Sequence, residues 1–217
     1  MKNKNYLLKT LMILSLAVIF SASAGAQNGD QEMSTLFGSK DGHIDHGGWG
    51  GLTFGYTQIK GKDTYLMGAR GGWLIDHHFT IGLAGQGFIS DKEYVDILPY
   101  KDVNLVGGYG GLFLEAIIAP NYPVHVTIPV IIGAGGVSYV ENQPWDEYNN
   151  YHNDYSIDED AFFVFEPGLE IEVNLLKFMR FSVGGSYRYT SDVNMINSSS
   201  NMLRGFNGYF GLKFGSF

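Results

Sequence analysis

The stretch FVFEPGLEIEVN, Phe163 to Asn174, decides the fold class because it alternates between two kinds of side chain. Every second residue from Phe163 onward is apolar, and the residues between them include three acids: Glu166, Glu170 and Glu172. Successive side chains of a β-strand point to opposite faces, so this stretch predicts a strand with one apolar and one acidic face. The next stretch, 179–189, repeats the pattern with arginines on its polar face.

The same period of two recurs along most of the chain. It defines eight segments: 47–58, 64–75, 78–89, 103–118, 122–139, 161–174, 177–189 and 203–216. Short connectors (76–77, 119–121, 175–176) alternate with connectors that are mostly long (59–63, 90–102, 140–160, 190–202). Short turns at one end and longer loops at the other are typical of bacterial outer-membrane barrels. We therefore predict an all-β fold, an eight-stranded antiparallel up-and-down transmembrane β-barrel.

Aromatic side chains lie near both ends of the predicted segments, as they do at the two membrane interfaces. The loop ends carry Tyr56, Tyr65, Tyr139, Phe163, Tyr187 and Tyr189, and the turn ends carry Trp73, Phe79, Tyr122, Phe178 and Phe214. Pro123 and Pro129 predict a bulged or overlong fifth strand, since proline cannot donate to a ladder. The terminal Phe217 differs in parity from Phe214, which predicts a bulge or a position past the last strand.

The N-terminus has the pattern of a secretory signal peptide. Lys2, Lys4 and Lys9 precede or flank an uncharged apolar run, 10–20, and Ala24-Gly25-Ala26 fits a small-residue cleavage site. We expect three parts: a signal peptide (1–26), a periplasmic leader (27–45) and the outer-membrane barrel (46–217). The expected location is the cell outer membrane of a Gram-negative bacterium.

Composition excludes several function classes. The 217 residues contain 30 Gly but only 6 Pro, and the formal charge is -8. That balance argues against nucleic acid as a partner, which needs a basic patch. The chain has no Cys, which excludes disulfides, thiolate metal sites, a thiol nucleophile and a lipid-modified N-terminal Cys.

The polar parity of the segments predicts a lumen network of charged and polar side chains. An eight-stranded barrel is just wide enough for its own side chains to fill it, and buried charges there must be paired. We expect a filled scaffold rather than an ion path. The predicted members are Arg70, Gln86, Glu115, His125, Glu166, Glu170, Glu172, Arg180, Arg188 and Lys213, joined by Tyr109, Thr127 and Asn207.

The connector 140–160 is the most distinctive exposed stretch. It contains seven acids and no Lys or Arg, with aromatic residues between the acids. It predicts either a solvated loop or a recognition surface that includes Trp145, Asp146, Glu147, Tyr148, Tyr151, Asp154 and Tyr155. Together with 90–102 and 190–202, it is the expected site for an extracellular ligand.

Motifs for catalysis or metal binding are weak. His77 and His78 are adjacent and would point apart on a strand, and the patch DGHIDH, 41–46, reads as a polar leader. His125 and Thr127 share a face, a spacing like the His and Ser of lipid-A deacylases, but Thr replaces Ser and the flanking residues differ. We predict no catalytic residues, no metal and no cofactor.

Several stretches resemble a family of small exported barrel proteins of Bacteroidota. They are HGGWGGLTFGYTQI (46–59), GARGGWLIDHHFTIGLAGQGF (68–88), PVHVTIPVIIGAGGVSY (123–139), EPGLEIEVNLLKFMRFSVGGSYRYT (166–190) and LKFGSF (212–217). The resemblance covers nearly all of the chain that follows the predicted signal peptide, and it implies an outer-membrane barrel without supplying catalytic residues. More loosely, the chain is similar to the OmpX/OmpA class of eight-stranded barrels, whose members are adhesins, defence proteins or envelope scaffolds.

These features predict a monomeric, non-enzymatic barrel surrounded by outer-membrane lipid. Its expected role is that of an envelope scaffold, or of a surface-recognition or adhesion protein that acts through its loops. The alternatives are a barrel enzyme acting on lipid or peptide, a narrow channel, and a soluble lipocalin-like carrier with an apolar interior.

Overall fold

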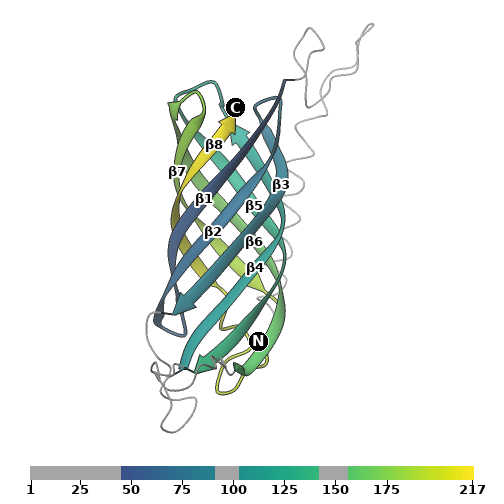
Figure 1. Ribbon diagram of the computed structural model, residues 1–217, viewed down its shortest axis with the longest axis vertical. Coiled ribbons are helices and arrows are strands. Elements are labelled where there is room, and N and C mark those ends of the chain that lie inside the picture. Colours follow the sequence, from purple (N-terminus) through teal and green to yellow (C-terminus); the bar gives the residue numbers. More distant parts are fainter. Residues whose placement is uncertain (1–44, 91–102, 142–155) are drawn as a thin grey trace, which may run out of the picture. The chain divides into compact units, whose positions relative to one another are not determined.

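The computed structural model describes residues 45–90, 103–141 and 156–217, which form a closed barrel of antiparallel strands (Figure 1). The predicted all-β class and the eight-stranded up-and-down order are confirmed. The strands are β1 (His46–Ile59), β2 (Lys62–Ile75), β3 (Phe79–Ser90), β4 (Val103–Ile118), β5 (Val124–Glu141), β6 (Ser156–Leu176), β7 (Met179–Thr190) and β8 (Gly205–Ser216).

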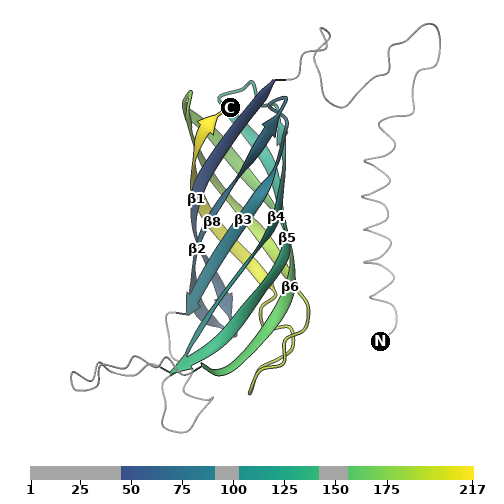
Figure 2. The ribbon, with the colours of Figure 1, turned by 45° about the vertical axis from the view of Figure 1, so that its right-hand side comes forward.

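Pairing of the first strand with the last closes the barrel. Each strand pairs with its neighbour in sequence, and β1 pairs with β8 from Gly48↔Ser216 to Thr57↔Asn207. The strands run obliquely around the barrel in both ribbon views (Figure 2). Closure pairs the two strands that would otherwise be the edges of the sheet. Within the described ranges, no helix is long and apolar enough to cross a membrane.

The two ends of the barrel differ in their connections. At one end, here the inner end, β1 begins, β8 ends and three short turns join the strands. At the other, the outer end, lie the long connectors 91–102, 142–155 and 191–204 and one tight turn, Lys60-Gly61. Both turn residues have positive φ, 52° and 71°, as a type I′ hairpin turn requires, and Gly61 adopts this conformation without steric cost.

Of the two alternatives for the fifth strand, the structure has the overlong one, since β5 spans 18 residues, and the predicted start of the sixth strand was wrong. The β5–β6 register is the same at Thr127↔Glu170 and at Val130↔Pro167, so β5 passes Pro129 without a bulge. The register shifts instead between Tyr139 and Val140. β6 also begins at Ser156, so the connector 140–160 shortens to 142–155 and its last acids belong to a strand.

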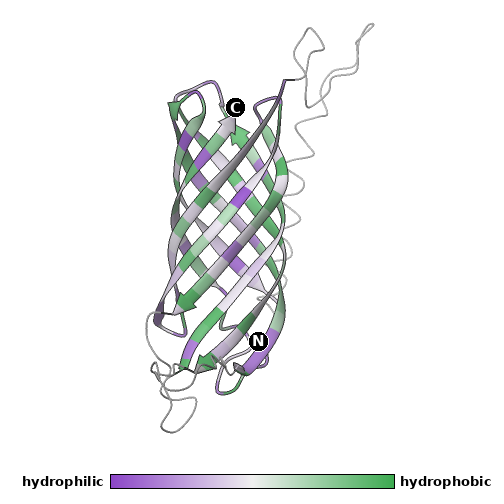
Figure 3. Cartoon of the chain, in the orientation of Figure 1, coloured by the Kyte–Doolittle hydropathy of each residue, from purple (hydrophilic) through white to green (hydrophobic). Residues whose placement is uncertain are grey.

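The outside of the barrel is apolar, and a belt of charged and polar side chains is buried in its interior, an arrangement unlike that of a soluble protein. The side chains of β6 alternate in burial along the strand, and Figure 3 shows hydropathy alternating along the strands. On the outer surface Leu83 and Phe206 are 71% and 79% exposed, whereas Glu172 in the interior is 0% exposed. Tyr139, predicted for the outer aromatic girdle, is fully buried, because its parity in β5 turns it into the lumen.

Candidate functional site

The polar side chains predicted for the lumen lie inside the barrel. Nine of the ten principal members are buried, and Gln86 is half-buried. Among the described residues, four buried carboxylates face four buried cations, so the lumen is close to neutral when His125 is uncharged. The carboxylates are Glu115, Glu166, Glu170 and Glu172, and the cations are Arg70, Arg180, Arg188 and Lys213.

Arg70 of β2 and Glu170 of β6 form a two-point ion pair across the lumen. Arg70 donates from Nη1 to Glu170 Oε1 at 2.5 Å and from Nη2 to Oε2 at 2.7 Å. Tyr209 donates its hydroxyl to Glu170 Oε1 at 2.8 Å, and the second nitrogen of Arg70 also reaches Ser182 Oγ at 3.3 Å. This parallel geometry is the strongest form of an arginine–carboxylate contact.

A second cluster gathers around Glu172, nearer the inner end. Its carboxylate lies 2.8 Å from Lys213 Nζ, 2.9 Å from His125 Nε2 and 3.4 Å from Arg180 Nη1. Lys213 also donates to Glu115 Oε2 at 2.6 Å. One lysine from β8 therefore bridges carboxylates of β4 and β6, which ties three strands together through the interior.

Glu166 is held by neutral donors. It accepts hydrogen bonds from Tyr109 (2.5 Å), Ser186 (2.5 Å) and Asn207 (2.9 Å). Three donors to one carboxylate replace the hydration that it loses inside the barrel.

Arg188 lies apart from the ion pairs. Its Nε donates to the carbonyl of Leu203 at 2.7 Å, while the guanidinium faces the rings of Phe88 and Tyr109, 5.4 and 5.7 Å from their centroids. Its two terminal nitrogens have no hydrogen-bond partner among the described residues. Arg188 thus contacts the loop 191–204 and the lumen aromatics, not the carboxylate belt as expected from its parity.

A small void remains at mid-height in the lumen. Its volume is about 20 Å³, and Arg70, Gln86, Glu166, Ser186 and Tyr209 contribute to its lining. That volume is enough for about one water molecule. The polar belt is therefore filled by its own side chains, as expected for a barrel of this strand number.

Two apolar clusters enclose the polar belt, and the polarity pattern alone did not predict them. The outer cluster joins lumen side chains such as Leu66, Phe88 and Leu105 to four residues of the loop 191–204. These loop residues, all buried, are Val193, Met195, Met202 and Leu203. The signal was in the sequence, since five apolar side chains, these four and Ile196, are unusual in a solvated loop. The loop 191–204 is therefore the cap of the outer end.

The inner cluster lies against the ion pairs and includes the terminal phenylalanine. Trp49 and Phe113 contact edge to face, 5.7 Å between centroids, and Phe217 packs against this cluster. The Arg180 guanidinium lies 3.9 Å from the centre of the Phe217 ring. β8 ends at Ser216, which resolves the parity of Phe217: it lies past the last strand and on the lumen side.

Polar contacts hold the cap in place. Asp158 and Asp160, alternate residues of β6, accept hydrogen bonds from the backbone N–H groups of Ile196 (2.6 Å) and Asn194 (2.7 Å). From the opposite side, Lys60 donates to the carbonyl of Asn197 at 2.8 Å. The acids at the start of β6 therefore anchor a loop.

Replacing the two acids that anchor the cap, Asp158 and Asp160, is expected to loosen the cap without unfolding the barrel. Each charge-assisted hydrogen bond contributes about 1.5–3 kcal/mol. In the double variant Asp158→Ala/Asp160→Ala, trypsin should cleave after Arg204 at least about tenfold faster, because cleavage follows the population of the open form. Glu159→Ala, which lies between them, is the matched control and should not change the rate. Equal cleavage in all three proteins would contradict the anchoring role.

The predicted recognition residues fall outside the described residues. Trp145, Asp146, Glu147, Tyr148, Tyr151, Asp154 and Tyr155 all lie in 142–155, between β5 and β6. Loop 91–102 lies outside them as well, so only the cap can be described among the three long connectors.

The candidates for enzymatic or metal chemistry have structural partners. His125 Nε2 contacts Glu172, and its Nδ1 lies 3.2 Å from the carbonyl of Tyr122. Thr127, by contrast, has its Oγ1 buried without a hydrogen bond to any described residue. Both residues lie near the inner end of β5. In the described part of the chain, no three His, Cys, Asp or Glu residues are arranged to hold a metal ion.

No family model matches the chain, and a search of curated proteins found no relative. Among solved structures, the chain is similar to Neisserial surface protein A (11% identity, TM-score 0.48, 79% of this chain and 98% of that chain). It is also similar to the N-terminal β-barrel domain of Pseudomonas aeruginosa OprF (10%, 0.40, 77% and 96%). A third is Ail, the attachment invasion locus protein of Yersinia pestis (10%, 0.38, 78% and 97%). At these identities and TM-scores, function does not transfer from those barrels to this chain.

Proposed function

We propose that the protein is an integral outer-membrane barrel, exported through the N-terminal signal at 1–26, with a filled lumen and no enzyme activity. Its role is that of an envelope scaffold or a surface-recognition protein that uses its outer loops. The observation that carries this proposal is the inverted polarity of the closed wall. Large apolar side chains cover the outside, and ion pairs occupy the inside.

The outer surface of the barrel is favourable in lipid and unfavourable in water. Soluble monomers rarely expose contiguous apolar patches beyond a few hundred Å², yet here the exposed apolar side chains come from all eight strands. Lipid is the medium in which such a surface is favourable and in which every strand needs a paired neighbour. A lipocalin-like carrier would have the opposite arrangement, with an apolar interior and charges outside.

We assign surface recognition to the outer end of the barrel because the long loops between strands lie there. The lumen below is closed by the cap, by the polar belt and by the inner cluster, so an extracellular ligand meets loops and not a pore. Loop 142–155, with its interleaved acids and aromatic residues, is the proposed contact surface. Envelope lipid and this ligand are the proposed partners, and the barrel is proposed to be monomeric.

Detergent dependence tests the membrane assignment. The protein should be extracted from cell envelopes only by detergent and should change its gel mobility on heating, because a folded barrel resists unheated dodecyl sulfate. In planar bilayers it should carry no steady current, since ion pairs fill the lumen and the mid-lumen void beside Arg70 and Glu166 holds about one water. Extraction in plain buffer would overturn the membrane assignment, and a steady current would favour the channel alternative.

A further inference from the structure

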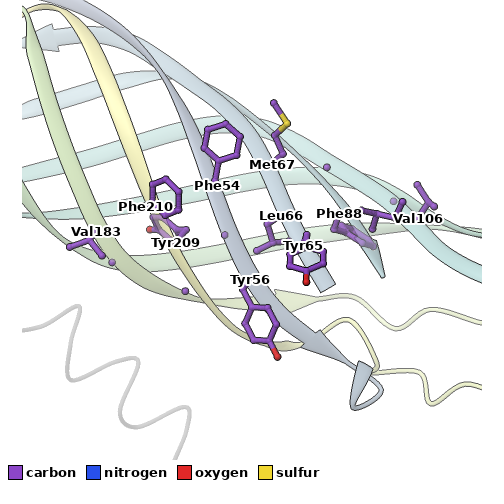
Figure 4. A pocket seen from close by; sticks show the side chains of 16 residues that line it. Phe54, Tyr56, Tyr65, Leu66, Met67, Phe88, Val106, Val183, Tyr209 and Phe210 are labelled. Carbon is purple, nitrogen blue, oxygen red and sulfur yellow. The ribbon is translucent and has the colours of Figure 1, made fainter. Parts of the chain in front are cut away.

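We infer that a furrow on the outer wall of the barrel binds one acyl chain of a membrane lipid. The inference rests on the proposed membrane position, since lipid is then the medium in contact with this wall. Figure 4 shows Phe54 and Met67 on one side of the furrow and Tyr56 and Tyr65 on the other.

The furrow lies between two rows of outward side chains. One row contains Phe210, Phe54 and Met67, and the other contains Tyr56, Tyr65 and Ile89, all about 40–60% exposed. The floor between them consists of residues whose side chains face the lumen. The registers place these floor residues opposite one another in one row across the strands: Gly184↔Tyr209↔Gly55↔Leu66↔Phe88↔Gly107.

A second hollow continues the same row onto the next two strands. The first hollow is about 820 Å³ and the second about 600 Å³, and they share Val106 and Gly107. From Gly107 the floor continues to Val137 and Asp160. The furrow is thus one path, which begins among apolar side chains and ends beside Ser138 and Glu159.

The furrow climbs by about the depth of one lipid leaflet. On β7 the floor residue is Gly184, which lies five residues from the inner end of that strand. On β4 the floor residue is Gly107, which lies eleven residues from the inner end of that strand. Six more residues at about 3.3 Å each, on strands tilted by about 40°, raise the path by about 15 Å. Half of a hydrocarbon core about 30 Å thick is also about 15 Å.

The width of the furrow fits a hydrocarbon chain but not an α-helix of another protein. Outward residues two apart on a strand are about 6.7 Å apart, which sets the spacing of the two rows. An α-helix about 10–12 Å across does not fit between them. A single hydrocarbon chain does, and aromatic side chains already line both rows. Phe54 and Phe210 stack at 5.8 Å, and Tyr56 is fixed by a 2.6 Å hydrogen bond to Asp63, so the walls are ordered in advance.

Two outward glycines keep the furrow open. A Cβ added at Gly208 would meet nothing within 4 Å, and one at Gly87 would meet only backbone oxygens at 3.8 Å. Neither glycine is therefore needed to relieve crowding in the wall. Gly208 pairs with Tyr56 and Gly87 with Met67, so both lie in the rows that line the furrow, and a large side chain at either position can fold across its floor.

Native mass spectrometry of the barrel released from dimyristoyl phosphatidylcholine nanodiscs tests the inference. The wild-type barrel should retain one phospholipid, and Gly208→Trp and Gly87→Trp should each lower that retained fraction at least about tenfold. Gly50→Trp is the matched control, because Gly50 is outward, has nothing within 4 Å and lies outside the furrow. It should retain lipid as the wild type does.

The outcomes separate this inference from the proposed function. A heat-modifiable, detergent-extracted barrel that retains no phospholipid above the level of the blocked variants overturns the furrow and leaves the membrane assignment intact. A dimer that the furrow variants abolish would show a second copy in the furrow instead, and would also overturn it. Extraction without detergent would overturn the membrane assignment itself.

Discussion

Gly82→Ala is expected to prevent the barrel from reaching its folded, heat-modifiable form. Gly82 of β3 faces the lumen opposite Gly72 of β2, where the wall curves tightly. A Cβ at Gly82 would overlap the carbonyl of Gly71 and lie 2.5 Å from Gly72 Cα. Both are backbone atoms of a paired strand and cannot move aside, so the cost should reach at least about 3 kcal/mol, the upper part of the usual range for overpacking.

The neighbouring outward glycine is the control for this change. Gly85 lies three residues further along the same strand but faces outward, and a Cβ there would meet nothing within 4 Å. Gly85→Ala should change stability by no more than about 0.5 kcal/mol. The folded fraction after refolding into lipid vesicles, read from unheated gel mobility, measures both variants. Equal folded fractions would refute a steric role for the lumen glycines.

Breaking the Arg70–Glu170 pair from one side is expected to destabilise the barrel strongly. Either Arg70→Met or Glu170→Met leaves one buried charge without its partner, which typically costs about 3–5 kcal/mol. The double variant should cost clearly less than the sum of the two, because both charges are then gone. A residual loss of about 1–3 kcal/mol remains in the double variant, since Tyr209 loses its acceptor.

An exposed arginine–carboxylate pair, joined at one point, provides the comparison. Arg204 and Asp192 lie 2.7 Å apart in the cap, but their side chains are 37% and 66% exposed. Replacing either with alanine should change the free energy of unfolding by at most about 1 kcal/mol. Urea titrations in lipid vesicles measure both pairs. Additive losses for Arg70 and Glu170 would show that the two charges do not stabilise each other.

Much of the lumen could be predicted because strand periodicity is local. Glu166, Glu170 and Glu172 share a parity, and that parity points one way wherever the strand lies. The same rule would have added Ser182, Ser186 and Tyr209, which share the parity of the predicted members on β7 and β8 and prove to be hydrogen-bond partners.

The partners within the lumen could not be predicted from periodicity. Arg70 and Glu170 are 100 positions apart, and Lys213 and Glu115 are 98 apart. Such pairs depend on the stagger of the strands around the ring, to which every register contributes. For the same reason Arg188, predicted for the ion-pair network, instead meets the carbonyl of Leu203.

The sequence by itself determined the strand order, the lumen face and the charges placed there, because alternation needs only neighbouring residues. The chain is also rich in glycine and contains no cysteine. Only the tertiary structure decided that lumen-facing and outward glycines have different roles, that the loop 191–204 folds inward as a cap, and that Phe217 closes the inner end. These features depend on contacts between distant strands, which exist only once β8 pairs with β1 and the curvature of the wall is set.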